Sequence, residues 1–133
     1  MTTITAVMTK KLQSIPGERS VAEATRRMRD DRIGSLLVEQ TGEYVGIVTE
    51  TDVVRKGVAE GRDLEKLTVE KIMSSPMAGI ESIRSVQDAH DMMADLGIRH
   101  LVVREAGKVI GVLSVRDLLV YFKSVSEPNI TQD

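Results

Sequence analysis

The stretch Gly46-Ile-Val-Thr49-Glu-Thr-Asp52 returns sixty-five positions later as Gly111-Val-Leu-Ser114-Val-Arg-Asp117. The same offset aligns most of the 133-residue chain with itself, without an insertion. Self-similarity at a fixed period dictates architecture, so it must be settled before any local pattern is interpreted. We therefore interpret the chain as two copies of one structural unit.

Each copy repeats the same order of predicted elements. A serine is followed three residues later by an acidic residue at Ser20 and at Ser85, which is the spacing of a helix-capping box, so we expect helices to begin there. Short apolar runs then flank a turn at Gly42 or Gly107, which predicts a β-hairpin. A second helix should end near residue 61 in the first copy and near residue 124 in the second.

The predicted order is therefore β-α-β-β-α in each copy, an α+β fold with a sandwich-like arrangement. We place the first repeat at residues 1–61, a linker at 62–67 and the second repeat at 68–124. The polar tail at 125–133 should fray. Short helical turns are expected at the start of each repeat, from Thr3 to Met8 and from Thr68 to Met73.

Composition excludes several classes of function. No apolar run approaches the roughly 20 residues that cross a bilayer, and the N-terminus lacks the pattern of a secretory signal, so we expect a cytoplasmic protein without a membrane partner. The absence of cysteine excludes disulfides and thiolate chemistry. A net charge of −2 gives no general attraction to nucleic acid. His90 and His100 form no zinc pattern, so no metal is expected.

The repeated segment groups chemical functions that suit a nucleotide. A glycine within a strand allows close approach to the main chain, and N–H groups at a strand-to-helix turn suit phosphate. A carboxylate at Asp52 or Asp117 is able to accept both hydrogens of a ribose diol. The same spacing from Thr49 or Ser114 is that of a capping box, which needs no ligand. The residues alone leave both interpretations open.

The duplication, the order of elements and the two Gly-h-x-[Ser/Thr]-x-x-Asp segments together resemble the CBS domain pair, also called a Bateman module. Val7-Met8-Thr9, Ile72-Met73-Ser74 and Gly97-Ile-Arg-His-Leu-Val-Val103 add to this resemblance, which covers nearly the whole chain. It implies two units packed sheet to sheet about a pseudo-twofold axis, with two clefts that hold adenine nucleotides or related adenosyl ligands. It also implies a regulatory protein and not an enzyme, so no catalytic residues are expected.

In that family each cleft combines the Asp-bearing turn of one copy with strand residues of the other. The resemblance implies a first site formed by Thr49, Thr51, Asp52, Ile80, Ile98, Arg99 and His100. It implies a second site formed by Ser14, Ile15, Ile33, Gly34, Ser35, Ser114, Arg116 and Asp117. Arg99-His100 stands where the first copy has Gly34-Ser35, so we expect the Asp52 site to prefer phosphorylated ligands.

The resemblance therefore predicts a sensor of AMP, ADP or ATP, with no obligatory cofactor. Apolar residues on the second helices that one copy's core cannot obviously bury predict a homodimer, the commonest closed assembly, and they are Val53, Val54, Val58, Leu118, Leu119 and Tyr121. Because the chain ends where the second copy does, its output should pass through an unknown protein effector or through the oligomer. Two alternatives stay open, namely an interaction domain with unoccupied clefts and a sensor of S-adenosylmethionine or NAD.

Overall fold

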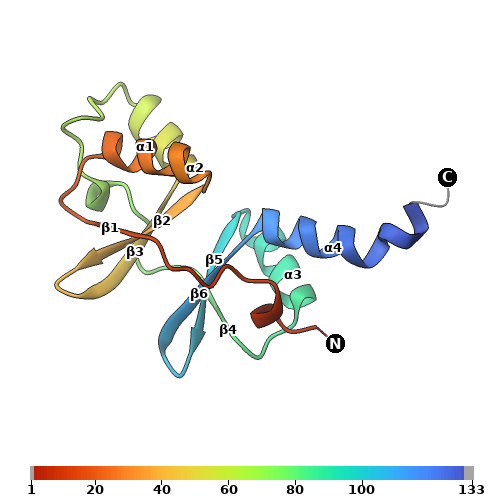
Figure 1. Ribbon diagram of the computed structural model, residues 1–133. Helices are drawn as coiled ribbons and strands as arrows, with labels where there is room; N and C mark the ends of the chain where they lie inside the picture. Colours follow the sequence, from red (N-terminus) through yellow and green to blue (C-terminus); the bar gives the residue numbers. More distant parts are fainter. Residues whose placement is uncertain (1, 131–133) are drawn as a thin grey trace. The chain divides into compact units, whose positions relative to one another are not determined.

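The computed structural model describes residues 2–130, and these form two compact units (Figure 1). The central unit is Gln13–Met77, and the split unit combines residues 2–12 with residues 78–130. Each unit contains one three-stranded sheet, in the strand orders β1-β2-β3 and β4-β5-β6. The α+β fold and the β-α-β-β-α order of each repeat are confirmed.

The central unit builds its sheet from one parallel and one antiparallel pairing. Its elements are β1 (Ser14–Pro16), α1 (Val21–Asp31), β2 (Ser35–Gln40), β3 (Glu43–Thr49), α2 (Glu50–Asp52), the π-helical η2 (Val53–Val58) and the 3₁₀ turn η3 (Val69–Lys71). Apolar residues of α1, β2, β3 and η2 form one buried cluster, and both helices lie on the same face of the sheet (Figure 1). Burial of this single face fixes the register of the strands.

The split unit repeats the arrangement. Its elements are the 3₁₀ turn η1 (Ile4–Ala6), β4 (Gly79–Glu81), α3 (Val86–Leu96), β5 (His100–Glu105), β6 (Lys108–Ser114) and α4 (Val115–Ile130). The expected helix starts are confirmed, because the Ser20 and Ser85 hydroxyls accept hydrogen bonds from the N–H groups of Glu23 and Asp88. The hairpins turn at Thr41-Gly42 and at Ala106-Gly107, where both residues have positive φ, as a type I′ turn requires.

The helical turns at the start of each repeat are present, but they pack on the opposite repeat. Ile4 is fully buried in the cluster of the split unit, and Val69 and Ile72 are buried in the cluster of the central unit. Thr9 pairs with Val112 through two backbone hydrogen bonds of 2.9 and 3.0 Å. The compact units therefore differ from the sequence repeats, because the leading segment of each repeat packs in the unit that contains the rest of the other repeat.

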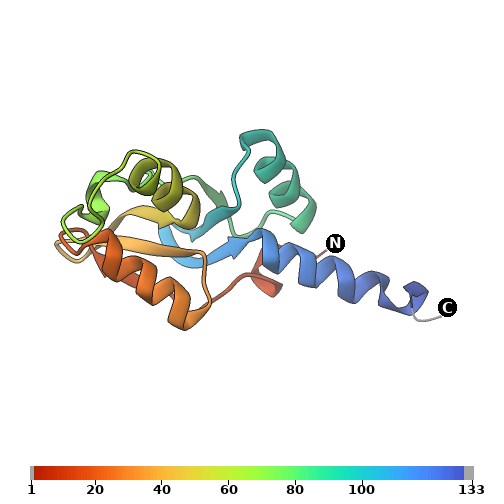
Figure 2. The same ribbon diagram turned by 90° about the horizontal axis from the view of Figure 1, so that it is seen from above.

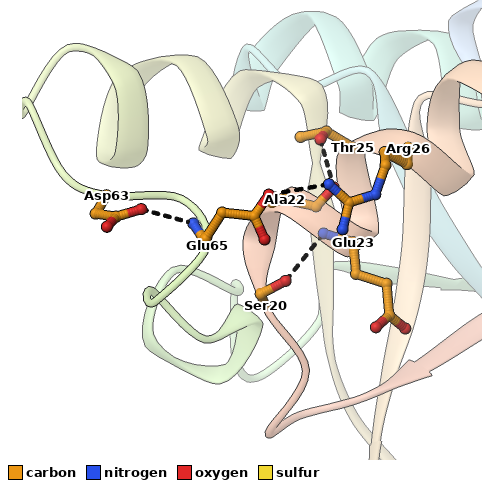
Figure 3. A network of polar contacts seen from close by, with 7 residues as sticks. All are labelled: Ser20, Ala22, Glu23, Thr25, Arg26, Asp63 and Glu65. Carbon is orange, nitrogen blue, oxygen red and sulfur yellow. Dashed lines mark hydrogen bonds and ion pairs between the residues drawn. The ribbon is translucent and has the colours of Figure 1, made fainter.

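The segment 62–77, here called the linking segment, also closes the N-terminal end of α1. The N–H groups of Val21 and Ala22 donate to the carbonyls of Leu67 and Leu64 at 2.7 and 2.9 Å. Figure 3 shows the neighbouring side chains, among which Arg26 pairs with Glu65 at 3.0 Å. Two donors that a helix end leaves unsatisfied are thus paired with main chain from 40 or more residues away.

The second helices differ from their predicted lengths. In the central unit the α-helix stops at Asp52 and continues as η2, in which Ala59 N–H donates to the Val54 carbonyl five residues earlier. Leu64 packs closely against Gly57 of η2, since a methyl group there would lie 2.9 Å from Leu64 Cδ2. In the split unit α4 continues to Ile130 (Figure 2), beyond the end near residue 124 that the sequence predicted, and the fraying of the tail stays a prediction.

Two serine hydroxyls near the end of α4 donate hydrogen bonds within the helix. Ser124 Oγ donates to the Tyr121 carbonyl at 2.6 Å, and Ser126 Oγ donates to the Phe122 carbonyl at 2.8 Å. The remainder of the predicted tail, 131–133, lies outside the described residues. Among the helices of residues 2–130, none combines the length and the apolar character needed to span a membrane.

The exchange of leading segments generates a stability prediction. Ile4→Ala should lower the free energy of unfolding by about 2–5 kcal/mol, because a fully buried side chain leaves a cavity. Hydrogen exchange should show the loss of protection in β5 and β6 before it appears in β2 and β3. Ile83→Ala is the control, since Ile83 is 83% exposed, and it should change stability by no more than about 0.5 kcal/mol. If the loss of protection were confined to Gln13–Met77, the packing of the leading segment on the opposite repeat would be contradicted.

Candidate functional site

The turn from β3 to α2 is closed by a reciprocal capping box in the central unit. The Thr49 N–H and hydroxyl donate to Asp52 Oδ2 at 3.0 and 3.1 Å, and the Asp52 N–H donates to Thr49 Oγ1 at 3.2 Å. Asp52 is 7% exposed, and its Oδ1 forms an ion pair with Lys56 Nζ at 3.1 Å. The helix cap predicted from the spacing is therefore present.

The turn from β6 to α4 repeats this geometry in the split unit. The Ser114 N–H donates to Asp117 Oδ2 at 2.9 Å, and the Asp117 N–H donates to Ser114 Oγ at 3.1 Å. The Thr9 hydroxyl lies 3.4 Å from both carboxylate oxygens. Asp117 is half-buried and, within the described residues, forms no ion pair.

The two carboxylates divide their oxygens in the same way. The backbone cap uses only Oδ2 in both units, and Oδ1 faces a partner outside the cap, which is Lys56 for Asp52 and Thr9 for Asp117. A carboxylate oxygen offers two lone pairs, so Oδ1 retains capacity for another donor. Capping a helix and accepting a hydroxyl from a ligand are therefore compatible roles for these aspartates.

The expectation that the turns present unpaired N–H groups to a phosphate was wrong for most of the groups concerned. In the central unit three of the four N–H groups from Thr49 to Asp52 have acceptors, because Glu50 N–H also donates to the Gly34 carbonyl at 3.0 Å. Val115 N–H donates in the same way to the Arg99 carbonyl at 2.9 Å. A phosphate would depend on side-chain donors more than on the main chain.

The strand glycines were predicted to allow a ligand close to the main chain, but a methionine side chain lies against each of them instead. A methyl group added at Gly46 would lie 2.5 Å from Met73 Sδ and 2.9 Å from the Ser74 carbonyl. One added at Gly111 would lie 2.5 Å from Met8 Sδ. The close approach that these glycines permit is therefore that of the exchanged segments, and not that of a ligand.

The structure brings most of the predicted residues of the central unit to one end of its sheet. Ser35, the first residue of β2, pairs with Thr49, the last residue of β3. Ser14 begins the neighbouring β1, donates its hydroxyl to Glu39 and accepts a hydrogen bond from Arg27 on its carbonyl. Most of the predicted residues lie near this end, namely Ile33, Gly34, Ser35, Thr49, Thr51 and Asp52, whereas Ser14 and Ile15 pair with Leu37 and Val38 further along β2. Ile15 and Ile33 pack in or against the hydrophobic cluster, and the Ile15 side chain is fully buried.

Most of the predicted residues of the split unit meet in the corresponding place. His100, which begins β5, pairs with Ser114, which ends β6. Arg99 precedes the strand and is exposed, whereas Ile80 belongs to the buried cluster and Ile98 packs against it. The residues near this end are Ile98, Arg99, His100, Ser114, Arg116 and Asp117, whereas Ile80 pairs with Val103 further along β5. The expectation that each ligand site combines the two repeats stays a prediction.

Sequence reasoning missed Lys56 and Thr9 as partners of the two carboxylates. Lys56 lies four residues after Asp52, a spacing that favours an ion pair on a helix and was sufficient to identify it. Thr9 is 108 positions from Asp117 and reaches it only through the exchange of segments, which no local pattern indicates. Within residues 2–130, no three metal-ligating side chains gather as a metal site.

Comparison with known proteins relates the chain to one family. The family model described as CBS domain matches residues 4–59 and residues 69–124. An uncharacterized 17.7 kDa protein of Acidianus ambivalens is 35% identical over 119 residues, which cover 88% of this chain and 71% of that protein. An uncharacterized conserved protein from Pyrococcus horikoshii has a similar structure, with a TM-score of 0.87, 31% identity and 92% coverage of each chain. A hexameric CBS-CP12 protein from bloom-forming cyanobacteria matches with a TM-score of 0.84 and 31% identity, over 96% of this chain and 75% of that one.

The reciprocal cap generates a second stability prediction. Asp52→Ala should lower the free energy of unfolding by about 1–2 kcal/mol, because the cap and a buried partner of the Thr49 N–H are lost. Glu50→Ala removes the same charge from an exposed position of the same helix and should cost at most about 0.5 kcal/mol. Urea denaturation of both variants measures the difference. Equal losses would show that the Asp52 carboxylate does not support the turn.

Proposed function

Because the chain belongs to the CBS domain family, we propose that it is a regulatory module that binds an adenosine-containing ligand such as AMP, ADP or ATP. In this proposal Asp52 and Asp117 each accept the hydroxyls of a ribose. The protein acts by binding and has no catalytic step, so its output passes to an effector protein or through its own assembly.

One observation supports this proposal most directly. In both units the carboxylate uses Oδ2 for the helix cap and keeps Oδ1 outside it. The cap fixes the position of each carboxylate before a ligand arrives, which reduces the entropy lost on binding. Asp117 is the less committed of the two, since its Oδ1 has only the 3.4 Å contact with Thr9.

Arg99, His100 and Arg116 are the side chains proposed to meet phosphate. Arg99 and Arg116 are exposed, and a guanidinium is able to donate two parallel hydrogen bonds to phosphate oxygens. Arg99 and His100 are proposed to serve the Asp52 site across the two repeats, as the family resemblance implies. Half-buried Ile33 and Ile98 are the aliphatic surfaces on which an adenine base would rest.

Assembly into a homodimer through the second helices is the other part of the proposal. Val54 and Val58 of η2 are each 58% exposed, and Leu119 of α4 is 64% exposed. Val53 and Leu118 were wrongly expected on the same surface, because both are buried in the hydrophobic clusters. Val120 and Val125 extend the apolar surface of α4. Exposed apolar side chains grouped on one element favour an interface, and a closed twofold pair is the commonest arrangement.

Adenine nucleotides should raise the thermal stability of the protein. AMP at 100 times its dissociation constant should add about 2.7 kcal/mol to the free energy of unfolding, if it binds only the folded state. S-Adenosylmethionine and NAD are tested beside AMP and ATP, and the largest shift identifies the ligand class. The double variant Asp52→Ala, Asp117→Ala should show no shift. No shift of the native protein with any of these ligands would favour an interaction domain with unoccupied sites.

The same measurement tests the phosphate contacts when AMP is compared with adenosine. In Asp117→Ala, which leaves only the Asp52 site, AMP should bind at least about tenfold more tightly than adenosine. Adding Arg99→Ala should reduce that preference, whereas adding Lys108→Ala, an exposed cation elsewhere in the split unit, should leave it unchanged. Equal affinities for AMP and adenosine would contradict the assignment of Arg99 and His100.

The proposed dimer has its own test. Sedimentation at micromolar concentration should give the mass of two chains, and Leu119→Asp should give the mass of one, because a charge at an apolar interface is left desolvated. Ile83→Asp introduces the same charge at an exposed residue of the turn between β4 and α3 and should leave the mass unchanged. A single-chain mass for the native protein would overturn the proposed assembly.

A further inference from the structure

A basic groove lies on the central unit, beyond the strand-to-helix turn. It has a volume of about 460 Å³ and is lined by Lys56, Glu60, Arg62 and Lys71. This volume falls within the range of about 300–1,000 Å³ that is typical of small-molecule sites. Three positive side chains and one negative side chain line it, in a protein whose overall net charge is −2. The local potential is therefore opposite in sign to that of the chain as a whole.

The cations of the groove differ from the other basic residues nearby. Arg26, Arg27 and Arg29 of α1 each pair with a carboxylate. Among the described residues, the side chains of Arg62 and Lys71 have no hydrogen-bond or ion-pair partner. Two like charges that face one groove without a carboxylate partner favour the binding of an anion there.

Lys56 is held in place and still has a donor to offer. Its ammonium group donates to Asp52 Oδ1 and to the Ile72 carbonyl, each at 3.1 Å. An ammonium has three N–H donors, so one remains after these two contacts. Because the side chain is already ordered, less conformational entropy is lost when an anion binds than for a free lysine.

The backbone that presents the other two cations is also fixed. Gly61, at φ +66°, reverses the chain after η2, and the Arg62 N–H donates to the Gly57 carbonyl at 3.1 Å. The Lys71 N–H donates to the Thr68 carbonyl at 3.1 Å within the turn η3. The groove is therefore bounded by two hydrogen-bonded turns.

Two of the groove's cations are specific to the central unit. With the sixty-five-residue offset, Lys56 corresponds to Tyr121, Glu60 to Val125 and Lys71 to Ala6. Tyr121 donates its hydroxyl to Thr2 in the split unit, and none of these three residues carries a charge at neutral pH. The positive groove is thus not a requirement of the repeated fold, which needs no cations at these positions.

We propose that this groove binds a polyphosphate group, held by Lys56, Arg62 and Lys71. Phosphate oxygens accept charge-assisted hydrogen bonds from both ammonium and guanidinium groups, and a chain of phosphates spans several cations at once. The group belongs either to free inorganic polyphosphate or to an organic phosphate. Lys56 also contacts Asp52 Oδ1, so the groove adjoins the proposed ribose contact of that residue, whereas within residues 2–130 Arg62 and Lys71 have no ion pair or hydrogen bond with Asp52 or Asp117.

Isothermal titration with inorganic tripolyphosphate tests the proposal on the intact protein. Arg62→Gln and Lys71→Gln should each weaken binding about tenfold. Both side chains are exposed and, within the described residues, unpaired, so neither change should impair folding, which the melting temperature checks. Lys66→Gln removes an equally exposed charge from the linking segment outside the groove and should leave the affinity unchanged. Raising the salt concentration should weaken binding to the native protein.

A second titration with fructose 1,6-bisphosphate distinguishes the source of the phosphates. If tripolyphosphate binds more tightly, the groove takes inorganic polyphosphate, and the reverse order assigns it to an organic phosphate. Arg99→Ala separates this site from the proposed nucleotide site, since it should leave unchanged the binding that Arg62→Gln and Lys71→Gln weaken. The proposal is overturned if neither compound binds, or if binding is lost in Arg99→Ala and kept in Arg62→Gln and Lys71→Gln.

Discussion

The absence of a side chain at Gly46 and Gly111 is the constraint on which the rest of the structure depends. Each glycine leaves room for a methionine, Met73 or Met8, from the leading segment of the opposite repeat. The approach of that segment allows its main chain to pair with the adjacent strand and its 3₁₀ turn to bury Ile4 in the cluster. Neither repeat therefore completes its own hydrophobic cluster. A larger residue at either glycine would displace the segment, and with it the contacts that close the unit.

The same exchange makes the two strand-to-helix turns chemically different while their backbones stay alike. In the split unit it brings Thr9 to Asp117, whereas in the central unit the oxygen outside the cap is neutralised by Lys56. The cap is a shared structural requirement, because each helix start needs acceptors for its N–H groups. The partner of Oδ1 is not required by the fold and is free to differ. Functional differences between the units should therefore depend on these partners and on the cations near them.

Patterns that act over a few residues predicted most of the fold. Ser20 and Ser85 gave the helix starts, and the positive-φ residues Gly42 and Gly107 gave the hairpin turns. The π-helical η2 was not predicted, because pairing over five residues is rare and appears mostly as single turns within α-helices. For the candidate site, the sequence predicted the aspartates and their caps. It did not predict that most N–H groups of the turns already have acceptors. The acceptor of the Glu50 N–H, for example, is the carbonyl of Gly34, which lies just before β2.

In the proposed function, the strand-to-helix turns of this CBS domain pair bind the ribose of an adenosine-containing ligand while they cap their helices. Titration of ¹⁵N-labelled protein with AMP, followed by amide chemical shifts, is the decisive measurement. The largest shifts are expected at residues 49–52 and 114–117, because the ligand would contact the carboxylates that accept hydrogen bonds from these amides. Saturable shifts that leave both turns unchanged would contradict this proposal, and so would the absence of any shift at millimolar AMP.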